Sequence, residues 1–195
     1  MTTPGRDLAL RTSRLLLEPL DPSHGAELWS AAARSLEELR PWLPWAIDAE
    51  EARIVEFATR CVSLWEQGSD HVFTLVHDGV AAGLVGLHNI DRVAGSASMG
   101  YWLDSRLTGR GLMTEAGEAV VELAFAELRL HRLGLLAAPG NVASVRVAEK
   151  LGFRREGQAP RYLHIDGGWR DHVIFGLTVE EVGDGVLAGY LARQG

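Results

Sequence analysis

The sequence has little cysteine and little lysine. Cys61 is the one cysteine among 195 residues, and Lys150 is the one lysine beside 18 arginines. A single cysteine excludes an intramolecular disulfide and a cysteine-based metal site, and it gives no indication of an oxidising compartment. We therefore expect a protein that holds no metal.

The sequence also lacks a long hydrophobic run and an excess of positive charge. No apolar stretch approaches the about 20 residues that span a membrane, and the first residues do not have the layout of a signal peptide. The formal net charge is −7, and such a surface repels polyanions while it accommodates a cationic or amine substrate. These features predict a cytoplasmic protein that contacts neither a membrane nor nucleic acid directly.

Hydrophobic residues make up 47% of the chain, which is enough for one substantial core. Their alternation predicts strands at residues 14–20, 71–79, 81–90, 96–103, 132–138, 154–163 and 169–178. A period near 3.6 predicts helices at residues 22–35, 49–67 and 142–151, and one more after Gly111. The Asp78-Gly79 pair is typical of a hairpin turn. We expect a mixed α/β fold of the α+β class, with helices on both faces of a twisted, mostly antiparallel sheet of about seven strands.

The chain shows no repeat and no Pro/Gly-rich linker that would divide it. We expect one domain over residues 1–195, with its core at about residues 14–178. Residues 179–195 would then form a C-terminal extension, in which a last helix is weakened by several glycines.

The segment YWLDSRLTGRGLMTEA, residues 101–116, runs from a strand through two glycines into a helix. A helix start leaves backbone N–H groups unpaired, with the positive end of the helix dipole behind them. Gly109 and Gly111 let an anion approach this backbone, and Arg106 and Arg110 add positive charge. The pattern predicts an anion site suited to a diphosphate, although a plain tight turn also uses such glycines. Its spacing matches neither a Walker loop nor the dinucleotide-binding fingerprint.

A second segment, NVASVRVAEKLGFRREG at residues 141–157, predicts a short capped helix. Asn141 is a good N-cap, and Gly152 followed by Phe153 suits a left-handed C-cap. Capping alone explains these residues. Together with the glycine-rich loop and the strand between them, however, this segment resembles the acetyl-CoA-binding motifs of the GNAT superfamily.

The resemblance extends to the RimJ/RimL-like branch of that superfamily, the ribosomal-protein N-acetyltransferase type. RLLLEPL at residues 14–20 and LRPWLPW at residues 39–45 are also similar to this branch, so the likeness covers about residues 14–178. It implies the GNAT fold, in which two central strands, here about residues 98–103 and 132–138, splay apart to hold an acyl-CoA.

The same resemblance implies which residues bind acetyl-CoA as a co-substrate. The pantetheine amides would bond to the backbone of Trp102 and Leu103, and the pyrophosphate to N–H groups between Leu107 and Thr114. The implied binding residues are Trp102, Leu103, Arg106, Leu107, Gly109, Arg110, Gly111, Leu112, Met113, Thr114, Asn141 and Ser144.

The resemblance also implies a mechanism without a covalent acyl-enzyme. An uncharged amine attacks the acyl carbonyl directly, so Cys61 is not required as a nucleophile. Ser144, in the first turn of its helix, resembles the residue of this branch that is proposed to give a proton to the departing thiolate. Plain capping or a contact with CoA would explain Ser144 equally well.

Two carboxylates that the resemblance leads us to expect are missing. Ser98 occupies the usual position of a glutamate in the central strand, and Arg161 stands before Tyr162 where RimL-type enzymes carry another. The remaining candidates for a general base, each more readily explained as a solvated loop residue, are His88, Asp91, Glu156 and His164. We therefore expect water near the cleft to take the proton, which favours acceptor amines of low pKa.

The sequence therefore predicts an acetyl-CoA-dependent N-acetyltransferase that acts on a primary amine. The acceptor is a protein N-terminus or a small molecule such as an antibiotic or metabolite, the latter with the option of a longer acyl-CoA. Trp42, Trp45, His88 and Tyr162 are the candidates for binding it, although both tryptophans would also suit the core. The alternative from another class is a non-catalytic acyl-CoA-binding module, and a homodimer is compatible with either.

Overall fold

The computed structural model describes residues 3–182, in which eight strands form one sheet. The strands are β1 (Leu10–Arg11), β2 (Leu16–Pro19), β3 (His71–His77), β4 (Val80–Asp91), β5 (Ser96–Leu103), β6 (Arg132–Ala137), β7 (Arg154–Ile165) and β8 (Gly168–Thr178). Their order in the sheet is β1-β2-β3-β4-β5-β6-β8-β7, and only the β5–β6 pair is parallel. The predicted fold class is confirmed. The strand beyond the expected seven is β1, whose two residues are too few to show an alternation.

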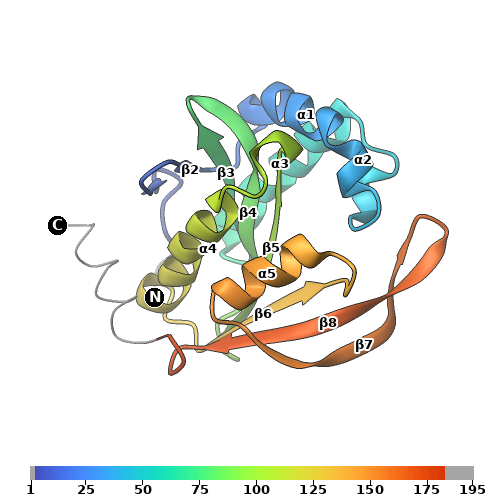
Figure 1. Cartoon of the computed structure of the whole chain (residues 1–195). Helices are drawn as coiled ribbons and strands as arrows, with labels where there is room; N and C mark the ends of the chain where they lie inside the picture. The colour runs from blue at the N-terminus through green and yellow to red at the C-terminus, as the bar shows by residue number, and fades with distance from the viewer. Residues whose placement is uncertain (1–2, 183–195) are drawn as a thin grey trace.

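Helices cover both faces of this sheet (Figure 1). The helices α1 (Gly25–Arg34) and α3 (Glu51–Gln67) lie on one face with the short α2 (Leu36–Leu39), while α4 (Leu112–Glu122) and α5 (Val142–Lys150) lie on the other. In β5, Trp102 packs into the cluster under α1 and α3, whereas Met99 and Leu103 pack into the cluster under α4 and α5. This alternation gives the sheet two buried faces.

Local sequence signals account for several element boundaries. Asp78 and Gly79 both have positive φ, 51° and 77°, as the predicted hairpin turn requires. Gly68 ends α3 in the left-handed conformation with φ 72°. The predicted helix at residues 22–35 begins as a 3-10 turn, Pro22–His24, because the Asp21 side chain caps it, and the α-helix starts at Gly25.

Other boundaries depart from the prediction. A π-helical turn, Leu123–Glu127, continues α4, and no sequence signal marked it. The strand expected at residues 14–20 is restricted to β2. The last helix expected in the C-terminal extension falls almost wholly on residues 183–195, outside the described residues. No helix within residues 3–182 is long and apolar enough to cross a membrane.

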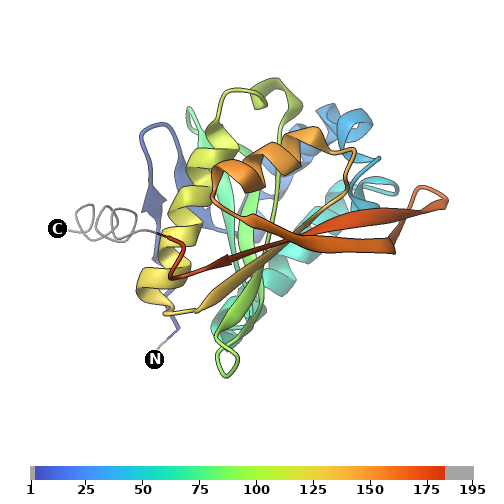
Figure 2. The ribbon, with the colours of Figure 1, turned by 60° about the horizontal axis from the view of Figure 1, so that its bottom comes forward.

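The central strands β5 and β6 splay apart, as expected from the resemblance. They pair only from Ser96 to Ser98 on β5 and from Arg132 to Gly134 on β6. Beyond this point β6 continues along β8 up to Ala137, while β5 continues along β4 up to Leu103. Figure 2 shows the two strands diverging below α5. The residues of β5 after Ser98 therefore present a backbone edge to the opening.

Candidate active site

The glycine-rich loop leads from β5 to the start of α4. Gly109 and Gly111 both have positive φ, 74° and 79°, and Gly111 is the N-cap of α4. A Cβ added to Gly109 would meet no atom within 4 Å, so the loop faces open space. Among residues 3–182, no backbone hydrogen bond outside regular elements uses the N–H groups of Leu112, Met113 or Thr114. These free donors at a helix start fit a pyrophosphate.

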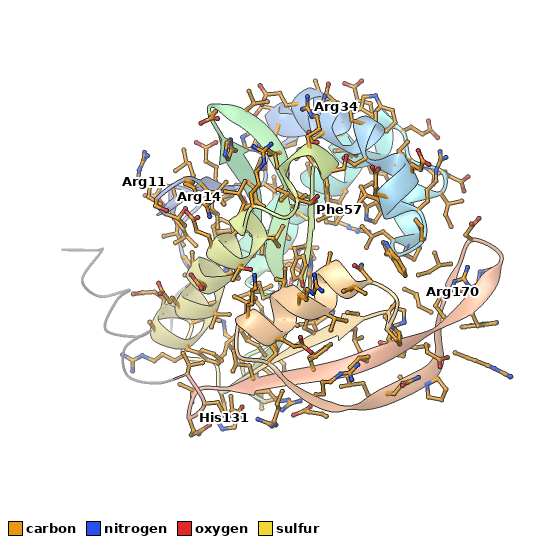
Figure 3. The ribbon with its side chains drawn as sticks, in the orientation of Figure 1. Arg11, Arg14, Arg34, Phe57, His131 and Arg170 are labelled. Carbon is orange, nitrogen blue, oxygen red and sulfur yellow. The ribbon has the colours of Figure 1, made fainter. Side chains whose placement is uncertain are left out.

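An ion pair at the surface anchors this loop to the sheet edge. The Arg14 guanidinium donates to Glu115 Oε2 at 2.7 Å and to the Arg110 carbonyl at 2.9 Å, and it lies beside the start of α4 in Figure 3. Burial alone would raise the pKa of Glu115, but hydrogen bonds from Thr12, Arg14 and Ser13 lower this pKa to about 2. Glu115 therefore stays charged, and it holds the loop from within α4.

The Arg106 side chain lies next to the loop and is itself held by a carboxylate. Arg106 and Arg34 donate to the buried Asp104 carboxylate at 2.9 and 2.7 Å. Burial would raise the pKa of Asp104, yet the bonds from Arg106 and Arg34 lower it to about 2. This cluster of two cations and one anion keeps one net positive charge beside the loop, whereas Arg110 is exposed on the loop itself.

The opening between β5 and β6 brings two hydroxyl groups together. The phenol oxygen of Tyr101 lies 3.0 Å from Ser144 Oγ and 3.1 Å from the Ser144 carbonyl oxygen. Burial raises the pKa of Tyr101 to about 12, so the phenol stays protonated and donates. The Asn141 side chain accepts from the Ser144 N–H at 3.1 Å, which caps α5 as expected. Ser144 of α5 therefore lies within hydrogen-bond distance of the Tyr101 side chain of β5, and its role as a proton donor stays a prediction.

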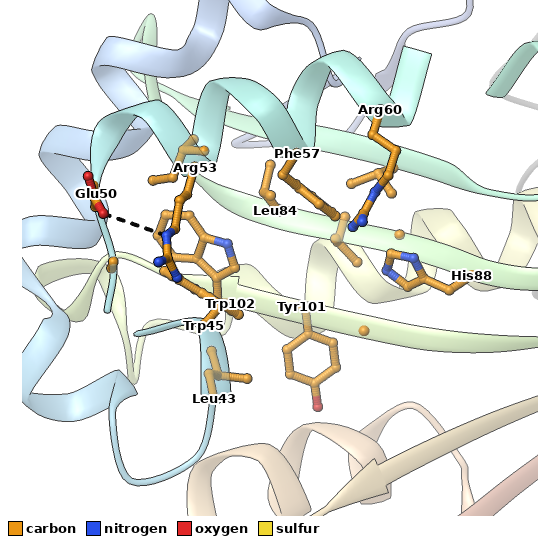
Figure 4. Close-up of a pocket in the computed structure, with 16 residues that line it drawn as sticks. Leu43, Trp45, Glu50, Arg53, Phe57, Arg60, Leu84, His88, Tyr101 and Trp102 are labelled. Carbon is orange, nitrogen blue, oxygen red and sulfur yellow. Dashed lines mark ion pairs between the residues drawn. The ribbon is translucent and has the colours of Figure 1, made fainter. Parts of the chain in front are cut away.

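A pocket of about 460 Å³ lies on the other face of β5, under α3 and residues 43–50 (Figure 4). Its floor is backbone, because Gly86 of β4 and Gly100 of β5 are register partners without side chains. Its apolar walls include Leu43, Trp45, Ile54, Phe57, Leu84 and Trp102. Its charged lining residues are Glu50, Arg53 and Arg60, with Glu50 and Arg53 paired at 3.6 Å.

Two of the four residues expected to bind the acceptor line this pocket. Trp45 is 37% exposed and lies 5.6 Å from the Trp102 ring, and His88 rises from β4. Trp42 instead lies against the loop before α5, where a Cβ added to Gly140 would meet its ring at 3.2 Å.

Tyr162 is exposed on the β7–β8 hairpin with its ring 5.4 Å from that of His172. It therefore lies outside the lining of the pocket. A role for Trp42 or Tyr162 toward the acceptor stays a prediction.

The candidates for a general base differ sharply in their surroundings. Asp91 caps a turn by accepting from the N–H groups of Val93 and Ala94, both at 2.8 Å. His164 packs its ring against Trp169 on the β7–β8 hairpin, with 5.5 Å between ring centroids.

Glu156 is paired with Arg132 and Arg154, and the bond from Arg132 lowers its pKa. Ser98 is exposed on β5 opposite His88, and Arg161 donates its backbone N–H to Asp171. Of the four candidates, only His88 lines the pocket.

Sequence reasoning missed three residues that build the site. Arg14 contacts Glu115, and Asp70 lies 2.7 Å from Nδ1 of His88; both partners are far along the chain, and no local pattern marks either contact. Tyr101 had a signal, since it directly precedes Trp102 on the strand expected to splay. Cys61 is buried inside α3, and burial raises the pKa of its thiol to about 11, which makes it a poor nucleophile. Within residues 3–182, no cluster of three His, Cys, Asp or Glu side chains could hold a metal ion.

Comparisons with known proteins identify the family of this chain. Residues 14–154 match the family described as the acetyltransferase (GNAT) domain. The chain is 31% identical to the [ribosomal protein uS5]-alanine N-acetyltransferase of Escherichia coli over 88% of this chain and 91% of that protein. It is 38% identical to the probable N-acetyltransferase YjcK of Bacillus subtilis over 68% and 73% of the two chains.

A solved structure is similar to this chain in fold as well as in sequence. Mycobacterium smegmatis RimJ, in complex with CoA-disulfide, is 27% identical and superposes with a TM-score of 0.83 over 92% of this chain and 89% of that chain. The match to the family model covers most of the sequence, including the glycine-rich loop and the capped helix α5. The chain therefore belongs to the GNAT acetyltransferase family, and it is an N-acetyltransferase that takes its acetyl group from acetyl-CoA.

Proposed function

We propose that the protein acetylates the α-amine at the N-terminus of a polypeptide. The pocket under α3 carries this proposal, because it lies across β5 from Ser144 and gives an amine its own approach to the splayed strand. The acetyl-CoA would lie along the opening between β5 and β6 and supply an activated acetyl group. Its pyrophosphate would be held by the N–H groups of residues 109–114, where Gly109 and Gly111 leave room.

The lining of the pocket favours an acceptor with one amine and a small apolar neighbour. Its walls are mainly aromatic and aliphatic, and such walls suit the first side chain of a peptide. A polyamine or an aminoglycoside would need several carboxylates, whereas the lining offers Arg53, Arg60 and a single carboxylate, Glu50, already paired with Arg53. The Escherichia coli relative, which is named as an alanine N-acetyltransferase of ribosomal protein uS5, supports the same acceptor class.

The proton chemistry supports an α-amine as well. An α-amine has a pKa near 8, so about a tenth is already neutral at pH 7, whereas a lysine amine near 10.4 is neutral at less than about one part in a thousand. The neutral amine is the form that attacks. Ser144, with Tyr101 bonded to it, would then donate toward the departing thiolate.

A panel of acceptors tests this proposal. Release of free thiol from acetyl-CoA would be measured with short peptides that begin with alanine, serine or leucine, with the same peptides N-acetylated but carrying a lysine, with spermidine and with an aminoglycoside. We expect turnover with the free N-termini, and mass spectrometry should place the acetyl group on the α-amine. Turnover with spermidine or the aminoglycoside alone would contradict the proposal.

A small-molecule amine with an apolar group is the second candidate acceptor. The pocket volume and aromatic walls favour it to the same degree as a single peptide side chain. The panel separates the two, because a small-molecule enzyme would acetylate a free aromatic amine or amino-acid amide faster than any peptide. In either case we propose that residues 1–195 act as one cytoplasmic acetyltransferase domain with its core at about residues 14–178.

A further inference from the structure

His88 stands in the pocket at the start of the splayed edge. It projects from β4 on the face that α3 covers, and its side chain is 30% exposed. A Cβ added to Gly100 would lie 3.4 Å from His88 Cδ2 and 3.5 Å from Nε2, so this edge of the ring lies directly over the glycine of β5. Gly100 is two residues past Ser98, the last residue of β5 that pairs with β6.

Asp70 holds the opposite edge of the His88 ring. Asp70 Oδ2 lies 2.7 Å from His88 Nδ1, and Oδ1 accepts the Asn89 N–H at 3.2 Å. Because an ionised carboxylate only accepts, Nδ1 of His88 carries the hydrogen of this bond. Asn89 has φ 51° where the register of β4 shifts, which brings its N–H to the same carboxylate. The Asp70 side chain is 15% exposed, so water has less access to the carboxylate than to the His88 ring.

The tautomer that Asp70 selects leaves a free lone pair on Nε2. No hydrogen bond from any residue in the range 3–182 reaches His88 Nε2. A neutral imidazole with Nδ1 bonded to a carboxylate is oriented and is stabilised when Nε2 takes up a proton. Figure 4 shows the ring of His88 directed into the pocket together with the Arg60 side chain of α3, whereas the Tyr101 ring points to the opposite side of β5.

We infer that His88 is the general base of the acetyl transfer and that Asp70 is its positioning residue, an inference that rests on the proposed acceptor pocket. The amine nitrogen forms a C–N bond to the acetyl carbon, and the C–S bond breaks. One proton of the nitrogen passes to His88 Nε2, and the thiolate takes the hydroxyl proton of Ser144 on α5, which a proton from water then replaces. The proton on His88 then leaves to solvent through the mouth of the pocket.

The arrangement separates the two proton transfers by the thickness of one strand. His88 lies over Gly100 on the α3 face, whereas Tyr101 directs its phenol to Ser144 on the α5 face. An amine that enters under α3 and a thiolate that leaves along the other face would therefore meet different groups. The sequence alone favoured water as the proton acceptor, and the contact with Asp70 is what makes His88 a better one.

Several charged and titratable groups lie near His88. Asp70 contacts Nδ1 of the ring, and Arg60 of α3 lines the same pocket. Glu50 and Arg53 form an ion pair in the lining of the pocket, and the Tyr101 phenol is bonded to Ser144 on the other side of β5. The acid limb of the activity is thus expected to include His88 and the acceptor amine.

Three variants and one control test the inference, all assayed with the acceptor peptide that the native protein turns over best. His88→Gln should lower kcat/KM by about 10²–10³-fold, in the range lost with a general base. The acid limb of log kcat/KM against pH should have a slope near 2 in the native protein and near 1 in His88→Gln. In His88→Ala, added imidazole should restore activity in proportion to its concentration. His164→Gln, a histidine outside the pocket, is the control and should keep native activity.

Readouts without turnover separate catalysis from folding. Calorimetry should give native CoA affinity for His88→Gln. NMR of the imidazole nitrogens should show His88 with hydrogen on Nδ1 and none on Nε2 at high pH. Asp70→Ala should shift this tautomer. It should also lower kcat relative to the native protein, while the acceptor KM changes little.

The outcomes distinguish a failure of the proposed function from a failure of the inference about His88. If the native protein acetylates no amine on the panel, the proposed function fails. If the native protein is active and His88→Gln keeps its kcat/KM within about tenfold, or imidazole does not rescue His88→Ala, the inference about His88 is overturned while the function stands.

Discussion

Lowering the pH should destabilise the protein through one buried histidine, His71. This residue of β3 is 0% exposed, and neither ring nitrogen has a hydrogen-bond partner within residues 3–182. Its ring packs edge-on against Trp65 with 4.5 Å between centroids. Burial, with a smaller contribution from Arg92, lowers the pKa of His71 from 6.5 to about 4, and Asp70 opposes this only in part.

The sign of the effect follows from which state binds the proton. Between pH 6.5 and about 4 the unfolded chain protonates His71 while the native protein keeps it neutral, so stability falls as the pH falls through this window. The full shift is worth about 3 kcal/mol, of which about 2 kcal/mol should be lost between about pH 7.5 and about pH 5. Asp104 and Glu115, whose pKa values are lowered to about 2, lose their contribution mainly below this window.

Urea denaturation followed by tryptophan fluorescence at these two pH values measures the loss. His71→Leu fills the site with an apolar side chain of similar volume. It should abolish most of the pH dependence of the free energy of unfolding. It should also stabilise the protein at neutral pH by about 1–3 kcal/mol, because no unpaired buried polar group remains. The control is His131→Gln, at a histidine whose side chain is 59% exposed. An unchanged pH dependence in His71→Leu would refute the reasoning.

Three further predictions concern the active site. Gly109→Ala and Gly167→Ala replace glycines of similar positive φ, 74° and 71°, with no atom near the new Cβ. Both should cost about 1–2 kcal/mol of stability, but only Gly109→Ala should weaken CoA binding by calorimetry, and equal CoA affinity would contradict the loop assignment. Trp45→Ala should raise the acceptor KM several-fold with little change in the acetyl-CoA KM; early melting would instead mark Trp45 as a core residue. Tyr101→Phe and Ser144→Ala should each lower kcat by a similar factor. In the double variant the two factors should not multiply, because the two hydroxyls act as one unit. A loss of kcat equal to the product of the two factors would show that the hydroxyls act separately.

Sequence alone determined the parts of the protein that depend on near neighbours. The glycine-rich loop, the Asn141 cap and the Asp78-Gly79 turn each use φ values or hydrogen bonds within four residues, and the structure has all three. The splayed strands followed from the family resemblance, because the two CoA motifs stand at the spacing that the fold requires. Local conformational preference is enough to specify such elements.

Tertiary structure alone decided which side chains meet in the site. Asp70 and His88 are 18 residues apart, and Tyr101 and Ser144 are 43 apart, so their contacts depend on strand register and on how α5 packs. A shift of one residue in β4 would turn His88 to the opposite face of the sheet, away from the pocket and from Asp70. Alternation along a strand indicates that two faces exist, but only the packed sheet determines which face carries the pocket and which carries the contact between Tyr101 and Ser144.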